Sequence, residues 1–316
     1  TSVTSEFLDE DIAAIGPVVD DVSDGFDEYW NTKEAIPVSV FDKHVPHQAL
    51  NETIEAGQRH LEKHRESPVI RGLNEHLVRE LVDGELPWVS AKTQLVLDHP
   101  DKVRGLVRRQ IGDVTERLIK MVSSATEEVI VVSPYFVPQR EGVNFFGALA
   151  RKGVRVVILT NSLASTNHSS VHAVYARYRK PLLRQGVELY ELRSIEEGSV
   201  VGEADPARLT LHSKVAVVDR QSVFVGSFNL DPRSLYINTE LGMVVESGVI
   251  GEAMASSGLE SLKTVAYRLK LNKRGRLNWH YRCSGEDLVA RTEPDTSLWR
   301  RILTRLMGLL PIEEQM

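Results

Sequence analysis

Short apolar runs that alternate with helical stretches constrain the fold of this chain more than any other feature. Several runs are apolar at consecutive positions, which is typical of strands covered by helices on both faces. The predicted strands are Glu128–Ser133, Val154–Thr160, Val187–Leu192, Leu209–Val218, Val223–Gly226 and Glu240–Glu246. Strands that alternate with helices in this way predict an α/β fold.

The segments between these strands have the pattern of helices. Arg140–Lys152 and His168–Arg184 show helical periodicity, and each is followed by a glycine, Gly153 or Gly186, that suits a helix C-cap. His47–Glu66 is polar and lacks a strong apolar stripe, so we interpret it as an exposed linker helix.

Composition bounds the class of protein. The 316 residues are 42% hydrophobic and 26% charged, which is typical of a globular protein with one large or two average domains. The single cysteine, Cys283, excludes an intrachain disulfide framework and most cysteine-based metal sites. The sequence holds no run of about 18 apolar residues, and its acidic start lacks the pattern of a signal peptide. We therefore expect neither a membrane span nor an export signal.

Charge is unevenly distributed along the chain. The net charge of −6 argues against a general nucleic-acid binder, because phosphate backbones are held mainly by Lys and Arg. Nine of the first 30 residues are acidic and none is basic, whereas Ser261–Arg305 holds eleven basic and four acidic residues. Part of the surface could therefore face an anionic partner.

A faint internal repeat relates the start of the chain to a later segment. Phe7–Val19 overlays Asn238–Ile250, which places Asp9 on Glu240. Both copies have the pattern of a strand that ends at an acidic residue and is followed by a helix. Chance agreement of two such junctions explains this similarity as well as a true repeat does.

The densest group of polar residues lies in Leu211–Glu240. It contains His212 and Lys214, which would project from one face of a strand. The polar break at Asp219–Ser222 predicts a hairpin turn. A loop of even length would place Lys214 opposite Ser227 and His212 opposite Asn229, so that the four side chains converge. A loop of odd length would break this convergence, and Asp219 is expected to fix the turn.

This set of side chains suits a phosphoryl group better than a metal ion. Lys214 would neutralise phosphate oxygens, while Ser227 and Asn229 would donate hydrogen bonds to them. His212 can act near neutral pH as a nucleophile or general acid, and Glu240 could accept its other ring N–H. The structural alternative is a buried core histidine. No metal and no cofactor is expected.

The spacing of these residues resembles the HxKxxxxDxxxxxxGSxN signature of the phospholipase D superfamily. The continuation Asn229–Ser234 and Asn238–Glu240 is similar to that of bacterial cardiolipin synthases, of the type without N-terminal membrane spans. Further similar stretches are Ser133–Pro138, Thr160–Leu163, Tyr175–Arg179, Gly186–Leu192 and Leu310–Glu313. The resemblance runs through nearly the whole chain.

The resemblance implies a mixed β-sheet flanked by helices and a metal-independent, two-step phosphodiester exchange. One motif histidine would form a phosphohistidine, and a second would protonate the leaving alcohol. Transfer to phosphatidylglycerol would give cardiolipin, whereas transfer to water would give phosphatidic acid. By this resemblance His212 takes the acid/base role. The implied catalytic set is His212, Lys214, Asp219 and Glu240, with support from Asp9, Asp231, Arg233 and Asn238.

The sequence departs from the family because it contains a single HxK motif. In the repeat Asp9 matches Glu240, so the first histidine would fall before Thr1. We expect a pseudo-repeat whose first copy is truncated, or a homodimer that pairs two copies of His212. The expected divisions are a tail of the first repeat (1–45), a helical linker (46–85), the motif domain (86–270), and a hairpin with an amphipathic helix (271–316).

Two further groups of side chains have the residue types of a ligand site. His172, Arg177 and Arg179 could line a channel for a lipid headgroup. His60 and His64, one helical turn apart, could bind zinc, but a solvated helix face explains them better because no third ligand is evident.

Ser297–Leu310 has an amphipathic helical pattern with Trp299 on its apolar side and three arginines on the other. A basic helix carrying Trp could lie in the interface of an anionic bilayer. The alternative is that its apolar side simply caps the protein core.

We therefore expect a phosphatidyltransferase of the cardiolipin synthase type, peripheral to the cytoplasmic side of the bacterial inner membrane. Its substrate would be phosphatidylglycerol or a similar phospholipid. The alternatives are a phospholipase D hydrolase or a nuclease with the same site, and a noncatalytic lipid-binding module. Nucleic acid is not the expected partner.

Overall fold

The computed structural model describes residues 5–41, 47–64, 80, 84, 86–104, 111–194, 208–311 and 313. The chain divides into two compact units, one of Thr1–Phe26 with Ala91–Met316 and one of Asp27–Ser90. The second unit contains α2 (His47–His64) and the 3₁₀ helix η1 (Val38–Val40), and α1 (Val18–Trp30) crosses the boundary. None of the described helices is long and apolar enough to span a bilayer.

The first unit is built on a mixed sheet of ten strands, in the order β12-β11-β10-β5-β4-β3-β7-β8-β9-β2. Strands β3, β4 and β5 are parallel, and the other neighbours are antiparallel. The strands are β2 (Lys92–Leu97), β3 (Glu128–Val132), β4 (Arg155–Asn161), β5 (Glu188–Leu192), β7 (Val215–Val218), β8 (Ser222–Gly226), β9 (Leu241–Glu246), β10 (Ala266–Leu271), β11 (Leu277–Cys283) and β12 (Glu286–Ala290).

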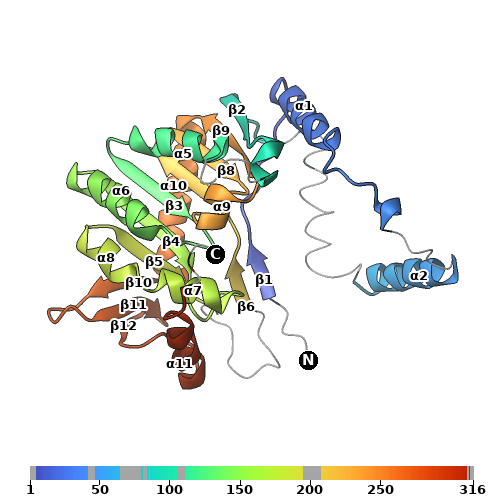
Figure 1. The fold of residues 1–316 in the computed structure, drawn as a ribbon. Coiled ribbons are helices and arrows are strands. Elements are labelled where there is room, and N and C mark those ends of the chain that lie inside the picture. Colours follow the sequence, from blue (N-terminus) through green and yellow to red (C-terminus); the bar gives the residue numbers. More distant parts are fainter. Residues whose placement is uncertain are drawn as a thin grey trace. The chain divides into compact units, whose positions relative to one another are not determined.

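Helices cover both faces of this sheet (Figure 1). The larger apolar core lies between one face and α5 (Asp113–Ser123), α6 (Gln139–Arg151) and α8 (Arg179–Arg184). A smaller core lies under α10 (Gly248–Val265) on the other face. Double coverage explains the consecutive apolar residues of the central strands. The predicted mixed sheet flanked by helices is confirmed.

The predicted helices differ from the observed ones mainly in one place. Gly153 and Gly186 both have left-handed backbones, with φ of +93° and +91°, so they end α6 and α8 as the sequence indicates. The single helix expected over His168–Arg184 is instead two helices, α7 (Ser169–Tyr175) and α8. The break allows the side chain of Arg179, the first residue of α8, to enter the core.

The single strand expected over Leu209–Val218 is also divided. β6 (Arg208–Leu211) leaves the large sheet and pairs in parallel with β1 (Ser5–Leu8). The next three residues, His212–Lys214, form no strand before β7 begins at Val215. The carbonyl of Leu8 accepts the backbone N–H groups of His212 at 2.8 Å and of Ser213 at 3.1 Å. The motif residues therefore lie in a loop held by the chain's N-terminal strand.

The hairpin between β7 and β8 has a different register from the predicted one. Val218 pairs with Ser222, which leaves a three-residue connection whose first two residues, Asp219 and Arg220, have φ of +50° and +55°. This odd loop sets Lys214 beside Gly226, whose N–H donates to the Lys214 carbonyl at 3.2 Å. The predicted pairing of Lys214 with Ser227 and of His212 with Asn229 is therefore wrong.

Gly226 allows β8 to end where the chain must bend toward the motif loop. A Cβ atom at this position would lie 2.3 Å from the carbonyl oxygen of Leu241 on β9. Beyond it, Ser227 and Asn229 lie outside the strand, and the Ser227 N–H donates to Leu241 at 2.8 Å. Ser227 and Asn229 therefore approach the motif loop through this bend and not through pairing of β7 with β8.

Asp219 anchors the hairpin to the start of β3. Its carboxylate accepts the backbone N–H groups of Thr126, Glu127 and Glu128, each at 2.8 Å. Burial raises the pKa of this carboxyl, but the three N–H donors outweigh burial and hold it below its ordinary value. Asp219 follows the end of β7 opposite to Lys214. Its assignment to the catalytic set is wrong, whereas its expected role in the turn is confirmed.

We expect Asp219→Ala to destabilise the chain by about 1–3 kcal/mol, because three backbone donors lose their acceptor. The contribution is present above the ordinary pKa of 3.8 and is lost as pH falls through the lowered folded value. Urea unfolding at pH 7 and pH 3 measures both effects. Asp287→Ala, on the exposed strand β12, is the matched control; equal stabilities of the two variants would contradict the anchor.

Candidate active site

The imidazole of His212 is open to solvent, and the backbone that precedes it is held by hydrogen bonds. Its side chain is 45% exposed. The preceding residue, Leu211, is gripped by the buried amide of Asn161, which donates to the Leu211 carbonyl at 2.9 Å and accepts its N–H at 3.0 Å. Asn161 ends β4, so the large sheet and the β1–β6 pair are joined directly beneath the motif loop.

Asp9 orients the imidazole. Its Oδ2 lies 2.7 Å from Nδ1 of His212, and Asp9 directly follows β1. An ionised carboxylate only accepts hydrogen bonds, so Nδ1 carries the hydrogen of this contact and Nε2 is left for chemistry. The ring edge of Phe7 packs against the same imidazole, with the ring centroids 5.7 Å apart.

Lys214 places a desolvated ammonium group next to His212. The residue is only 8% exposed, and Nζ donates to the backbone carbonyl of His212. Burial lowers the pKa of this ammonium, although the carboxylates of Asp9, Glu240 and Asp231 act in the opposite direction. A cation in such surroundings attracts an incoming phosphate more strongly than a hydrated surface lysine does.

Glu240 does not orient His212, which corrects the sequence-based assignment. Its carboxylate accepts the hydroxyl of Ser227. Asp9, the residue that matches Glu240 in the internal repeat, holds the imidazole instead. The repeat was therefore the better guide, because it singled out a carboxylate some 200 residues away from the motif.

Asp98 fixes Glu240 and was missed from the sequence. This fully buried carboxylate accepts the N–H of Glu240 at 3.1 Å, the N–H of Val114 at 2.9 Å and the ammonium of Lys102 at 2.6 Å. Its own N–H donates to the Glu240 carbonyl at 2.9 Å. A lone aspartate after a strand carries no spacing signal, since its partner Glu240 lies 142 residues further along the chain.

The residues after the bend hold the loop together. The Asn229 N–H donates to the Ser234 hydroxyl at 3.2 Å. Asp231 caps α9 (Pro232–Tyr236) by accepting the Ser234 N–H at 2.9 Å, and burial raises the pKa of its carboxyl. The side-chain Oδ1 of Asn229 is buried and has no hydrogen-bond partner among the described residues. It is the polar group of this loop that a ligand could satisfy.

Arg233 and Asn238 contribute backbone contacts to the same loop. The Asn238 N–H donates to the Arg233 carbonyl at 2.7 Å, which closes the chain after α9. Their predicted supporting role therefore has a structural basis in α9, and a direct role of either side chain toward a ligand stays a prediction.

The predicted headgroup channel is wrong. His172 and Arg179 are buried, and the guanidinium of Arg179 lies 2.7 Å from Glu191, 2.5 Å from Glu293 and 2.6 Å from the ring of His172.

Arg177 also has a structural role, because it donates to the carbonyl of Leu310 at 3.0 Å and ties the end of the chain to α7.

The pair His60 and His64, which we interpret as part of a solvated helix face, lies on α2, and the side chain of His64 is outside the described residues.

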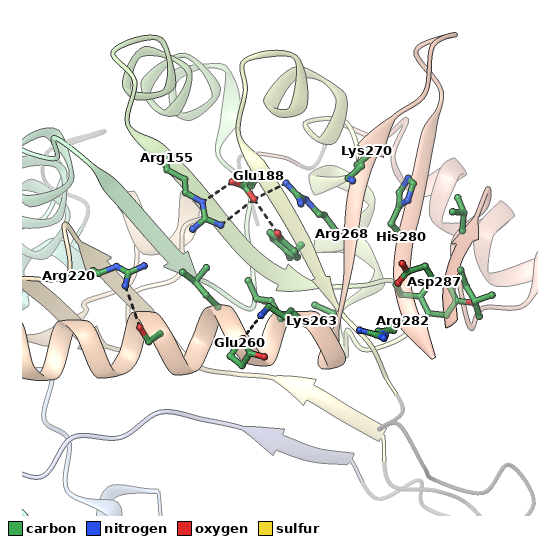
Figure 2. Close-up of a pocket in the computed structure, with 18 residues that line it drawn as sticks. Arg155, Glu188, Arg220, Glu260, Lys263, Arg268, Lys270, His280, Arg282 and Asp287 are labelled. Atoms are coloured by element: carbon green, nitrogen blue, oxygen red, sulfur yellow. Dashed lines mark hydrogen bonds and ion pairs between the residues drawn. The ribbon is translucent and has the colours of Figure 1, made fainter. Parts of the chain in front are cut away.

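A cavity of about 970 Å³ is lined by described residues, ten of which are labelled in Figure 2. It opens between α10 and β10–β12, and neither His212 nor Lys214 lines it. Its central carboxylate, Glu188, pairs with Arg155 at 2.8 Å and with Arg268 at 3.0 Å. A smaller cavity, of about 320 Å³, does reach Lys214.

Comparisons with known proteins place this site in a family. A family model described as "Cardiolipin synthase, PLD-like domain" matches residues 118–257. The chain is 40% identical to Cardiolipin synthase C of Escherichia coli strain K12, over 97% of this chain and 66% of that protein. It is 29% identical to an uncharacterized protein of Helicobacter pylori strain 26695, over 98% of this chain and 61% of that protein.

This chain thus spans two thirds or less of the length of these relatives. Among solved structures, the phospholipase D family member Nuc from Salmonella typhimurium is similar, with 16% identity and a TM-score of 0.41. The match covers 57% of this chain and 99% of that one.

We expect Asp98→Ala to lower the free energy of unfolding by about 3–5 kcal/mol, because it leaves the buried ammonium of Lys102 without its carboxylate. Thermal and urea unfolding measure this loss. Asp113→Ala, at the exposed start of α5, is the matched control and should change stability little. A variant at Asp98 as stable as this control would show that the buried pair does not hold Glu240 in place.

Proposed function

Because this chain belongs to the phospholipase D superfamily, we propose that it supplies one half of the active site of a phosphatidyltransferase of the cardiolipin synthase type. The observation that carries the proposal is the exposed imidazole of His212, oriented by Asp9 at 2.7 Å and placed beside the desolvated ammonium of Lys214. An acid/base group next to a fixed cation is what exchange at a phosphodiester requires.

In the first proposed step, an imidazole nitrogen of a second motif attacks the phosphorus of a phosphatidyl donor. A P–N bond forms and the P–O bond to the leaving alcohol breaks, while Nε2 of His212 delivers a proton to the leaving oxygen. In the second step His212 takes the proton of an acceptor hydroxyl, which attacks phosphorus and breaks the P–N bond. Phosphatidylglycerol is the proposed acceptor.

Asp9 and Lys214 have separate roles in this scheme. Asp9 contacts Nδ1 of His212 and so holds the ring with Nε2 toward the substrate. Lys214 balances the negative charge of the non-bridging phosphate oxygens, which is present before, during and after transfer. Neither role requires a metal ion.

The second histidine would come from another segment of a longer chain or from a second copy of this one. The sequence has one HxK motif, whereas the two-step exchange uses two imidazoles. Asp9 and Glu240 correspond in the internal repeat, and Asp9 holds an imidazole. By this correspondence Glu240 would orient the second imidazole across a pseudo-twofold axis.

We also propose that α11 (Leu298–Met307) attaches the protein to the cytoplasmic surface of an anionic bacterial membrane. Trp299 is 73% exposed, and the neighbouring apolar residues on that side are exposed as well, namely Leu298, Ile302, Leu303 and Leu306. The opposite side, with buried Thr304 and with Arg300 bonded to the Thr166 carbonyl at 3.1 Å, faces the protein. An outward apolar side argues against a simple cap of the core.

The catalytic proposal predicts that His212→Gln lowers turnover by about 10²- to 10⁴-fold, because no group remains to move the proton. The chain is incubated with phosphatidylglycerol vesicles, and cardiolipin and phosphatidic acid are quantified by mass spectrometry. His280→Gln, at a site remote from the motif, is the matched control. Asp9→Asn should lower turnover with little loss of stability.

Three results would contradict this proposal. They are unchanged turnover in His212→Gln, turnover by a chain that sedimentation shows to be monomeric, and faster cleavage of nucleic acid than of lipid. Phosphatidic acid as the main product would indicate a hydrolase with the same site.

The membrane proposal predicts that Trp299→Ser with Leu306→Ser weakens binding to phosphatidylglycerol vesicles by at least about tenfold, since each side chain contributes transfer free energy of 1.5–3 kcal/mol. Vesicle co-sedimentation measures this, and added salt should weaken binding further. Val289→Ser, an exposed site on β12, is the control. Equal vesicle binding by the double variant and the control would contradict the proposal that α11 attaches the protein to the membrane.

A further inference from the structure

An apolar cleft in the larger core is lined in part by Lys214 of the motif. Its volume is about 320 Å³, and it lies between α5 and α6 above β3, β7 and β8. Its walls are formed by aliphatic and aromatic side chains such as Leu118 of α5 and Phe145 of α6. Of the described residues that line it, Lys214 and Glu141 are the charged ones.

The floor of the cleft leads directly to the ammonium group. Val131, Ala216 and Phe224 form one row across the sheet, because Val131 pairs with Ala216 and Ala216 pairs with Phe224. Lys214 precedes Ala216 by two residues, and it lines the same cleft. The apolar cleft therefore includes the residue whose cation the proposed mechanism places on the phosphate.

The cleft opens to solvent at an apolar rim. Ile119, on the outer side of α5, is 44% exposed, and Ile111 before this helix is also exposed. At the motif end, Leu235 and Tyr236 of α9 form the wall. Apart from the carboxylate of Glu141, the lining combines apolar side chains with the cation of Lys214. This combination matches a ligand with an anionic head and a hydrocarbon tail.

We propose that this cleft binds one acyl chain of the phospholipid substrate while its phosphodiester rests on Lys214. The inference depends on the proposed function for the position of the phosphate. It extends that function because it makes the hydrocarbon tail, and not the headgroup alone, part of what the site recognises.

The volume of the cleft limits how many carbons of the acyl chain it can enclose. A methylene group needs about the volume of a water molecule, roughly 30 Å³, so the cleft holds about ten carbons. Each enclosed methylene strengthens binding by about fourfold, which is the equivalent of its transfer free energy from water. Carbons beyond this length lie at the rim near Ile119 and add little.

Calorimetric titration of the 316-residue chain with lysophosphatidic acids of 6, 8, 10 and 12 acyl carbons, each below its micellar concentration, tests the cleft. The expected affinity rises by about fourfold for each methylene up to about ten carbons and then levels off. Glycerol 3-phosphate, the same head without a chain, reports binding at Lys214 alone.

Leu118→Trp fills the cleft and should abolish the dependence on chain length while leaving the affinity for glycerol 3-phosphate unchanged. Lys120→Trp adds the same ring to an exposed site on α5 outside the cleft and should behave as the wild type. If Leu118→Trp does not fold, Ile119→Glu places a charge at the exposed rim and should weaken binding of the longer chains.

The outcomes separate this inference from the proposed function. Affinities that do not rise with chain length, or a rise that survives both Leu118→Trp and Ile119→Glu, would overturn the cleft even where His212→Gln abolishes turnover. If Leu118→Trp removes the rise in affinity with acyl chain length, acyl binding in the cleft is supported, even where His212→Gln leaves turnover intact. A rise removed only by the α11 double variant would assign chain binding to that helix and would also overturn the cleft.

Discussion

The carbonyl of Leu8 accepts the N–H groups of both His212 and Ser213, and this convergence determines the geometry of the whole site. Together with the pairing of β1 and β6, it holds the motif residues in a loop and not on a strand. It also brings the next residue, Asp9, within 2.7 Å of the His212 ring. A short segment at one end of the chain thus supplies the carboxylate that a motif 203 residues away requires.

The sequence predicted the architecture well because its signals are local. Consecutive apolar residues marked strands buried on both faces, and Gly153 and Gly186 marked helix ends. The register of the β7–β8 hairpin could not be predicted, since it depends on Asp219 and Arg220 both adopting left-handed backbones. Propensity disfavours that conformation, and the contacts of Asp219 to β3 impose it.

The candidate site shows the same division between local and distant information. His212 and Lys214 were found because their spacing is a local pattern, and the repeat pointed to Asp9. The roles of Glu240, Asp98 and Arg179 were wrong or missed, because each depends on a partner more than ten residues away. These partners are Ser227 for Glu240, Glu240 for Asp98, and Glu293 for Arg179. Residue type alone does not distinguish a buried ion pair from a ligand site.

The exposure of His212 bears on which acceptor this half-site favours. An imidazole that is 45% exposed admits water as readily as an alcohol, and water is far more concentrated than any lipid hydroxyl. Lys214 is shielded by the protein, whereas the imidazole of His212 is open to solvent. Under the proposed function, selective transfer to a lipid requires a cover over His212 that the described residues do not provide. The proposal assigns this cover to a second motif or to the substrate's own hydrocarbon.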